Sequence, residues 1–168
     1  SDVYKRQIQR SWLRFSRFSG NARLFWGAIR SSAPRISKNR NGLGSGVIFS
    51  KDGYIVTNLH IISGEKISVK LHNGKIFPAK IIGLDKNTDI AVLKISPEED
   101  LKPIVFGDST DLKVGDNVLA IGNPYGIGLS VSSGIISSTG RDYGNPYLEL
   151  IQTDAVINPG NSGGALIN

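Results

Sequence analysis

Cysteine and methionine are both absent from this 168-residue chain, and histidine occurs only twice. Without cysteine the protein can form no disulfide bond, offers no thiolate nucleophile and cannot build a zinc ribbon. Because methionine is missing even at position 1, and no closing element follows the last residues, we expect a fragment of a longer product. This length indicates one domain, or two small lobes that share a cleft.

Long hydrophobic runs are missing as well. The N-terminal region has no apolar run of the roughly 7–15 residues that a signal peptide needs, and nothing approaches a membrane span. Ile8, Trp12, Phe15 and Phe18 recur at helical spacing and form only a short basic amphipathic stretch. Such a stretch is compatible with a membrane-surface or nucleic-acid-binding tail, but a solvated or foreign extension is the simpler explanation. Membrane association is therefore not indicated.

Acidic residues are scarce at the start of the chain and common afterwards. Residues 1–41 carry ten Lys and Arg against one acid, whereas residues 42–168 carry ten against thirteen. The body is thus mildly acidic and offers no electrostatic footprint for nucleic acid. We interpret residues 1–41 as a basic N-terminal arm, non-native or disordered. Its first two dozen residues, opening with SDVYKRQ, are hypothesised to be foreign to the protein.

Helical periodicity is nearly absent from residues 42–168, and short β-prone runs take its place. Runs such as GSGVIF, YIVTN, DIAVLKI and NVLAIG are separated by turn residues at about ten-residue spacing. The pair Asn73-Gly74 predicts a hairpin. Helical turns are expected only after His60 and in DSTDLK. GNPYGIGLS lacks the following helix and the Lys-Ser/Thr of a phosphate loop, so we interpret it as a β-turn.

One hydroxyl stands out within the final segment, INPGNSGGALIN. Ser162 is flanked by glycines that permit positive φ and close approach of a substrate carbonyl, although an ordinary turn has a similar composition. A serine nucleophile needs a base, and His60 ends an apolar strand, where a purely structural role is the alternative. Asp89 begins the apolar strand TDIAVLKI, where it either orients an imidazole or caps a turn. The other histidine, His72, lies beside the hairpin turn and is expected to face solvent.

The three candidates are stronger together than apart. Their chain order, His60, Asp89 and Ser162, on an all-β pattern is the order of chymotrypsin-type proteases and not that of α/β-hydrolases. The glycine-rich turn also directs backbone N–H groups inward, so that those of Gly160 and Ser162 are candidates to hold an oxyanion.

Several long motifs carry a family resemblance from about residue 42 to residue 168. GLGSGVIFSKDGYIVTNLHII, TDIAVLKI, VGDNVLAIGNPYG, SSGIISSTGR and IQTDAVINPGNSGGALIN closely resemble the HtrA/Deg (Do-like) serine endopeptidases. The resemblance implies that His60 is the general base, Asp89 orients it, and Ser162 attacks the scissile carbonyl. It also implies an oxyanion hole formed by the backbone N–H groups of Gly160, Asn161 and Ser162.

The fold implied is the chymotrypsin/trypsin-like double six-stranded β-barrel, incomplete here at both ends. Residues 42–105 are expected to form the first barrel and residues 112–168 part of the second, with the break near residues 101–116. The segment before residue 42 does not look like the family's opening strand, and we expect no PDZ domain within these 168 residues.

The family acts on unfolded or damaged proteins of the bacterial periplasm or cell envelope, without ATP, metal or organic cofactor. Members usually form trimers or larger multiples, and a loop corresponding to Arg141–Tyr147 relays activating signals. Asn161 replaces the aspartate of digestive relatives, so activity is expected not to depend on N-terminal cleavage. Two alternatives remain: an inactive or chaperone-like binding module of the same fold, and a basic nucleic-acid- or membrane-binding protein acting through the arm.

Overall fold

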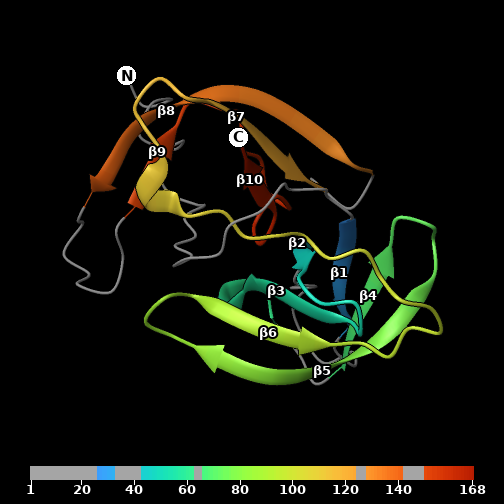
Figure 1. Ribbon diagram of the computed structural model, residues 1–168. Helices are drawn as coiled ribbons and strands as arrows, with labels where there is room; N and C mark the ends of the chain where they lie inside the picture. The colour runs from blue at the N-terminus through green and yellow to red at the C-terminus, as the bar shows by residue number, and fades with distance from the viewer. Residues whose placement is uncertain (1–25, 33–42, 63–65, 124–127, 142–149) are drawn as a thin grey trace.

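The computed structural model describes residues 26–32, 43–62, 66–123, 128–141 and 150–168. Within these ranges the chain forms a closed barrel and a separate curved sheet, which lie one above the other in Figure 1. The prediction of an all-β protein is confirmed. The described part of the chain has only two short 3-10 helical turns, η1 (Leu59–Ile61) and η2 (Ser109–Asp111), at the two places that the sequence indicates.

Six antiparallel strands close the barrel in the order β1-β2-β3-β6-β5-β4. Their bounds are β1 (Trp26–Ser32), β2 (Leu43–Ile48), β3 (Tyr54–Asn58), β4 (Lys66–Leu71), β5 (Ile76–Asp85) and β6 (Ile90–Lys94). The predicted hairpin joins β4 to β5, where Leu71 N–H donates to Lys75 O at 2.8 Å and Gly74 has φ 85°. Positive φ is the conformation that the Asn-Gly pair indicates.

The first strand, β1, corrects the expected domain boundary. Residues 26–32 pair with β2 on one side and with β4 on the other, so they close the barrel. The boundary at residue 42 is therefore too late for the barrel, and an opening strand is present after all. Without β1, the backbone groups at the edges of β2 and β4 would be left unpaired. The hypothesis of a foreign opening segment concerns residues outside the described ranges.

The second lobe is a four-stranded antiparallel sheet in the order β10-β7-β8-β9. Its strands are β7 (Asn117–Gly122), β8 (Ser130–Arg141), β9 (Leu150–Thr153) and β10 (Ala165–Ile167). The expected break near residues 101–116 lies in the connection between β6 and β7. Ser162 lies in the loop that leads into β10, whereas His60 and Asp89 belong to the barrel, so the candidate site residues come from both lobes.

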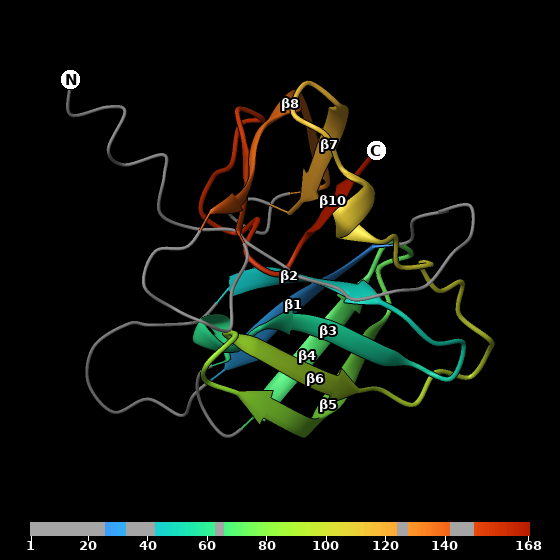
Figure 2. The same ribbon diagram turned by 60° about the vertical axis from the view of Figure 1, so that its left-hand side comes forward.

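Two apolar clusters hold this arrangement together. The first fills the barrel and contains the buried side chains Ile48, Ile55, Ile67, Val69, Leu71, Leu93 and Ile95. The alternation of KISVKL directs alternate apolar side chains of β4 into this interior. The second joins the lobes, because Val47 and Val56 of the barrel pack with Ala165 of β10. Figure 2 shows β10 descending from the second sheet toward β2.

Among the described residues, no helix is long and apolar enough to cross a membrane.

Candidate active site

His60 lies in the short turn η1, directly after β3. The turn is closed by a hydrogen bond from Ile62 N–H to Leu59 O at 2.9 Å. Leu59 N–H in turn donates to the backbone oxygen of Asp89, also at 2.9 Å. The turn that carries His60 is therefore hydrogen-bonded to the backbone of Asp89, the residue that precedes β6.

Asp89 also holds His60 through both oxygens of its carboxylate. Oδ1 accepts the backbone N–H of His60 at 2.8 Å, and Oδ2 lies 2.5 Å from its ring atom Nδ1. An ionised carboxylate only accepts hydrogen bonds, so this contact assigns the ring proton to Nδ1 and leaves the lone pair on Nε2. Both side chains are 42% exposed, and the imidazole is therefore accessible for proton transfer.

The backbone of Asp89 adopts a conformation that is uncommon outside glycine. Its φ is 57°, the one positive value at a non-glycine residue in the described part of the chain. Besides Leu59 N–H, its backbone oxygen accepts Asn58 Nδ2 at 3.1 Å. Aspartate tolerates the left-handed region better than most residues, and strained conformations of this kind concentrate at functional sites. Contacts from Asn58, Leu59 and His60 thus maintain the orientation of the carboxylate.

Ser162 lies in a tight loop that precedes β10. Asn161 N–H donates to Asn158 O at 3.0 Å, and Gly164 N–H donates to Asn161 O at 2.8 Å. Gly160 and Gly163 have φ values of 100° and 81°, which side-chain-bearing residues rarely adopt. Ser162 itself is half-buried. The glycines on both sides of the serine therefore serve the geometry of this loop.

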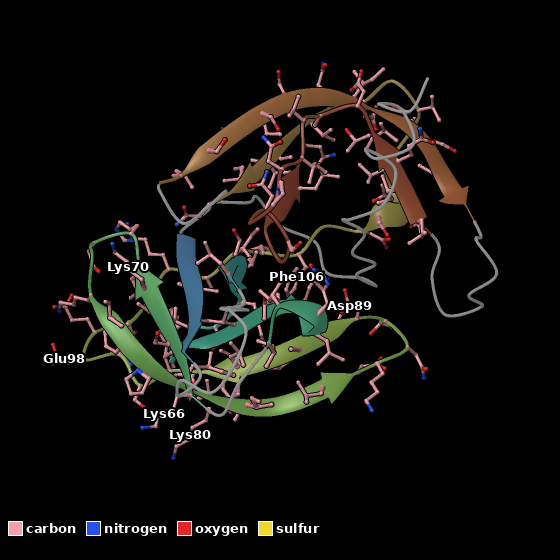
Figure 3. The ribbon with its side chains drawn as sticks, turned by 180° about the vertical axis from the view of Figure 1, so that it is seen from behind. Lys66, Lys70, Lys80, Asp89, Glu98 and Phe106 are labelled. Atoms are coloured by element: carbon pink, nitrogen blue, oxygen red, sulfur yellow. The ribbon has the colours of Figure 1, made fainter. Side chains whose placement is uncertain are left out.

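The loop docks against the barrel next to the strand that leads to His60. Ser45 N–H, in β2, donates to Ser162 O at 2.8 Å. A Cβ atom at Gly163 would overlap Ser45 O and the hydroxyl oxygen of Thr57. Only glycine therefore allows this close approach, and Thr57 lies three positions before His60. Asp89, labelled in Figure 3, lies on the side of the barrel that faces the second sheet, whereas Lys66 and Lys80 project from the far side.

The structure joins two of the three predicted catalytic residues by hydrogen bonds. His60 and Asp89 are paired, whereas in the described part of the chain no hydrogen bond links Ser162 Oγ to His60. The loop of Ser162 is tied to the barrel through Ser45 instead. The assignment of Ser162 as the nucleophile therefore stays a prediction.

One predicted oxyanion donor is already occupied. The N–H of Asn161 is used within the loop by Asn158 O, so it is not free to bind a second acceptor. The N–H groups of Gly160 and Ser162 donate to no other group among the described residues. Of the three predicted donors, the N–H groups of Gly160 and Ser162 are thus the two that remain available, and the oxyanion hole itself stays a prediction. The loop Arg141–Tyr147 lies outside the described residues, apart from the backbone of Arg141 at the end of β8.

The sequence analysis missed Ser45, Thr57 and Asn58, all of which are buried. Each is a polar residue within an apolar strand, and buried polar groups require hydrogen-bond partners. That signal was present in GSGVIF and YIVTN, but it does not specify the partner. Among the described residues, no group of three or more His, Asp or Glu side chains is placed to hold a metal ion.

The chain is similar to known serine proteases in sequence and in fold. A family model described as a trypsin-like peptidase domain matches residues 44–168. The chain is 49% identical over 136 residues to a probable periplasmic serine protease (do/HhoA-like) of Haemophilus influenzae, covering 78% of this chain and 29% of the relative. It is 55% identical over 132 residues to the serine endoprotease DegS of the same organism, covering 76% of this chain and 38% of the relative.

A solved structure of the HtrA-type protease AlgW with a tripeptide superimposes with a TM-score of 0.77 at 44% identity. The match covers 85% of this chain and 46% of AlgW. The chain thus spans only part of the length of each of these relatives. The expected chymotrypsin-like fold and the resemblance to HtrA/Deg proteases are confirmed, and the chain belongs to the trypsin-like peptidase family.

Proposed function

We propose that the protein is a serine endopeptidase of the HtrA type, in which Ser162 is the nucleophile, His60 the general base and Asp89 the residue that orients the base. The observation that carries the proposal is the double contact between His60 and Asp89, at 2.8 and 2.5 Å. It supports an imidazole with its lone pair on Nε2, which is what a serine hydroxyl requires of its base.

The proposed reaction proceeds through an acyl-enzyme. His60 Nε2 takes the proton of Ser162 Oγ while Oγ bonds to the scissile carbonyl carbon, and the N–H groups of Gly160 and Ser162 stabilise the resulting oxyanion. The protonated His60 then gives its proton to the leaving nitrogen as the C–N bond breaks. A water molecule, deprotonated by His60, hydrolyses the ester and releases Ser162. No cofactor enters this scheme.

The relatives support a proposal about substrate and compartment as well. Because the do/HhoA-like relative is named a probable periplasmic serine protease, we place the protein in the bacterial periplasm or cell envelope. The proposed substrates are unfolded or damaged proteins, and the complete protein is proposed to form a trimer or a larger multiple. The pairing of His60 with Asp89 favours an enzyme over an inactive binding module of the same fold.

The test is proteolysis by the complete gene product. A permanently unfolded substrate, such as a reduced and alkylated protein, should be cleaved much faster than its native form. The Ser162→Ala variant should show no cleavage while retaining the thermal stability of the wild type. Equal cleavage by this variant would overturn the assignment of the nucleophile, and preference for the native substrate would overturn the proposed substrate class.

A further inference from the structure

Ser45 is a polar residue at the centre of an apolar strand, and it is fully buried. It lies in β2, between two glycines. A buried hydroxyl in such a strand lowers stability unless it is fully hydrogen-bonded. The hydrogen-bond partners of the Ser45 hydroxyl therefore decide whether it can be accommodated there.

Every polar atom of Ser45 is engaged, and the partners lie in three separate segments. Its N–H donates to Ser162 O at 2.8 Å, and its Oγ donates to Gly160 O at 2.8 Å, across 115 positions of sequence. The same Oγ accepts the N–H of Asn123 at 2.9 Å. Its backbone oxygen accepts the hydroxyl of Thr57 at 2.6 Å. One residue thus connects the strand before His60, the end of β7 and the loop of Ser162.

The bond to Gly160 O determines the orientation of a peptide group in the candidate oxyanion hole. In a trans peptide the C=O and the following N–H point in opposite directions. With Gly160 O directed at Ser45, the N–H of Asn161 is directed away and meets Asn158 O at 3.0 Å. Loss of the Ser45 hydroxyl would release this peptide and allow it to rotate. Rotation would alter the backbone on which the N–H groups of Gly160 and Ser162 depend.

The hydrogen bond from Ser45 N–H to Ser162 O holds a second peptide group of the loop, the one between Ser162 and Gly163. Gly163 allows the loop to come close enough to β2 for this bond to form. Gly163 brings the loop so close that a Cβ atom there would overlap Ser45 O and Thr57 Oγ1. The strand that carries Thr57 continues directly into the turn of His60. Among the described residues, no hydrogen bond joins His60 directly to Ser162. The distance between the Ser162 loop and the His60 turn is therefore set through Ser45 and Thr57.

We propose that Ser45 is a positioning residue, which aligns the Ser162 loop and its oxyanion donors with the His60 turn without touching the substrate. The inference rests on the proposed function, since it concerns the same reaction. Misplacement of reacting groups by about 1 Å lowers rates roughly 10²-fold, which is the scale of effect expected.

The test compares Ser45→Ala with wild type in the complete gene product, using hydrolysis of a chromogenic peptide ester and reaction with a fluorophosphonate. The substitution removes Oγ alone, so the backbone bond to Ser162 O can persist. We expect kcat and the rate of fluorophosphonate labelling to fall together by about 10²-fold, with KM within about two-fold of wild type. A merely structural role would lower the folded fraction, which circular dichroism measures, and would leave kcat per folded molecule at the wild-type value.

Val69→Ala is the matched control. Val69 is as fully buried as Ser45, but it belongs to the apolar cluster that fills the barrel and not to the contacts with the Ser162 loop. At a temperature where both variants are folded, Val69→Ala should keep the wild-type kcat. If Ser45→Ala does not fold, Thr57→Val decides: it removes one hydrogen bond to Ser45 O with little change in shape, and kcat should fall by about five-fold.

Two outcomes overturn the inference: a kcat for Ser45→Ala within about three-fold of wild type, or an equal loss in Val69→Ala. If Ser45→Ala does not fold, an unchanged kcat in Thr57→Val overturns it. A wild-type protein that neither cleaves the ester nor reacts with the fluorophosphonate contradicts the proposed function itself. The two failures are therefore distinguishable.

Discussion

His60 donates two hydrogen bonds to the carboxylate of Asp89, one from its backbone N–H and one from its ring. The backbone bond fixes where the residue sits, and the ring bond fixes the rotation and the tautomer of the imidazole. The position and the tautomer of His60 are thus both controlled by the side chain of Asp89. The two contacts are separable by mutation, because they use different carboxylate oxygens.

The Asp89→Asn substitution should separate the backbone contact with His60 from the ring contact. The amide oxygen of asparagine can still accept the backbone N–H of His60, but its NH₂ group then faces Nδ1 and favours the tautomer with the proton on Nε2. Such an imidazole cannot act as a base, and kcat should fall by roughly 10⁴-fold, as in the best-studied triad. Peptide hydrolysis measures the rate, and a thermal melt checks the fold. A loss of less than ten-fold in a folded variant would mean that Asp89 does not orient the base.

Gly163→Ala should impair both stability and activity. The residue has φ 81°, and an added methyl group would overlap Ser45 O and Thr57 Oγ1. Strain and overlap together should cost more than about 2 kcal/mol of unfolding free energy. The loop of Ser162 should also move away from the barrel and lower kcat. Urea unfolding and peptide hydrolysis measure the two effects.

Gly74→Ala is the control for that experiment. Gly74 has a similar φ of 85°, but a methyl group there would meet no atom within 4 Å. Only the backbone strain remains, about 1–2 kcal/mol, and kcat should stay at the wild-type value. Equal losses of activity in the two variants would show that contact between Gly163 and the barrel is irrelevant to catalysis.

Asn161→Asp should destabilise the protein. The side chain of Asn161 packs against Gly122, and its Oδ1 is buried with no hydrogen-bond partner among the described residues. A carboxylate at this position would bury a charge without compensation, at a cost of at least about 1–3 kcal/mol. The midpoint of urea unfolding near neutral pH measures this cost, and lowering the pH toward the protonation of the new carboxyl group should reduce it. An unchanged midpoint would mean that a cationic partner is available there.

Lys94→Met should change the acid titration of Asp52 without affecting catalysis. The Lys94 ammonium, 2.6 Å from Asp52 Oδ2, and the Ser50 hydroxyl, 2.6 Å from Oδ1, lower the pKa of Asp52 below its ordinary value. A depressed folded-state pKa contributes stability that is present above the unfolded-state pKa and is lost as pH falls through the folded-state value. Removing Lys94 should raise the pKa of Asp52 and make the loss of stability in acid shallower.

Asp85 provides an internal reference for this titration. Its pKa is also lowered, but by hydrogen bonds from the Thr88 side chain and the Asn87 backbone. Carboxyl-carbon NMR should therefore show a shift at Asp52 and none at Asp85 in the Lys94→Met variant. A shift at both residues would indicate a general electrostatic effect rather than the local ion pair.

The paired acid and base were predictable from the sequence because each stands at the end of an apolar strand. His60 follows YIVTN and Asp89 precedes IAVLK, and antiparallel pairing of β3 with β6 brings these two ends together. Asn58 pairs with Ile90 in this ladder, so the residues just beyond the ladder meet. Local sequence patterns thus carried enough information for this half of the site.

The role of Ser45 was not predictable in the same way. Its contacts reach Gly160 across 115 positions, and several of them use backbone atoms, which every residue type possesses. The hydrogen bond of Asn161 N–H was not predictable for the same reason. Every non-proline residue has an N–H group, and the sequence does not show that Asn158 O accepts the one of Asn161. Strand β1 was missed because WGAIRSS lies within a stretch dominated by arginine, whose charge suggested a solvated arm.

The central claim is that Ser162 is a nucleophile activated by His60, and mapping of a covalent adduct tests it most directly. The complete gene product would be treated with a biotinylated fluorophosphonate, digested and analysed by tandem mass spectrometry, in parallel with His60→Ala and Ser162→Ala variants. The account predicts one adduct, on Ser162, formed at a strongly reduced rate in His60→Ala and absent in Ser162→Ala. An adduct on another residue, or labelling of Ser162 at the same rate without His60, would contradict it.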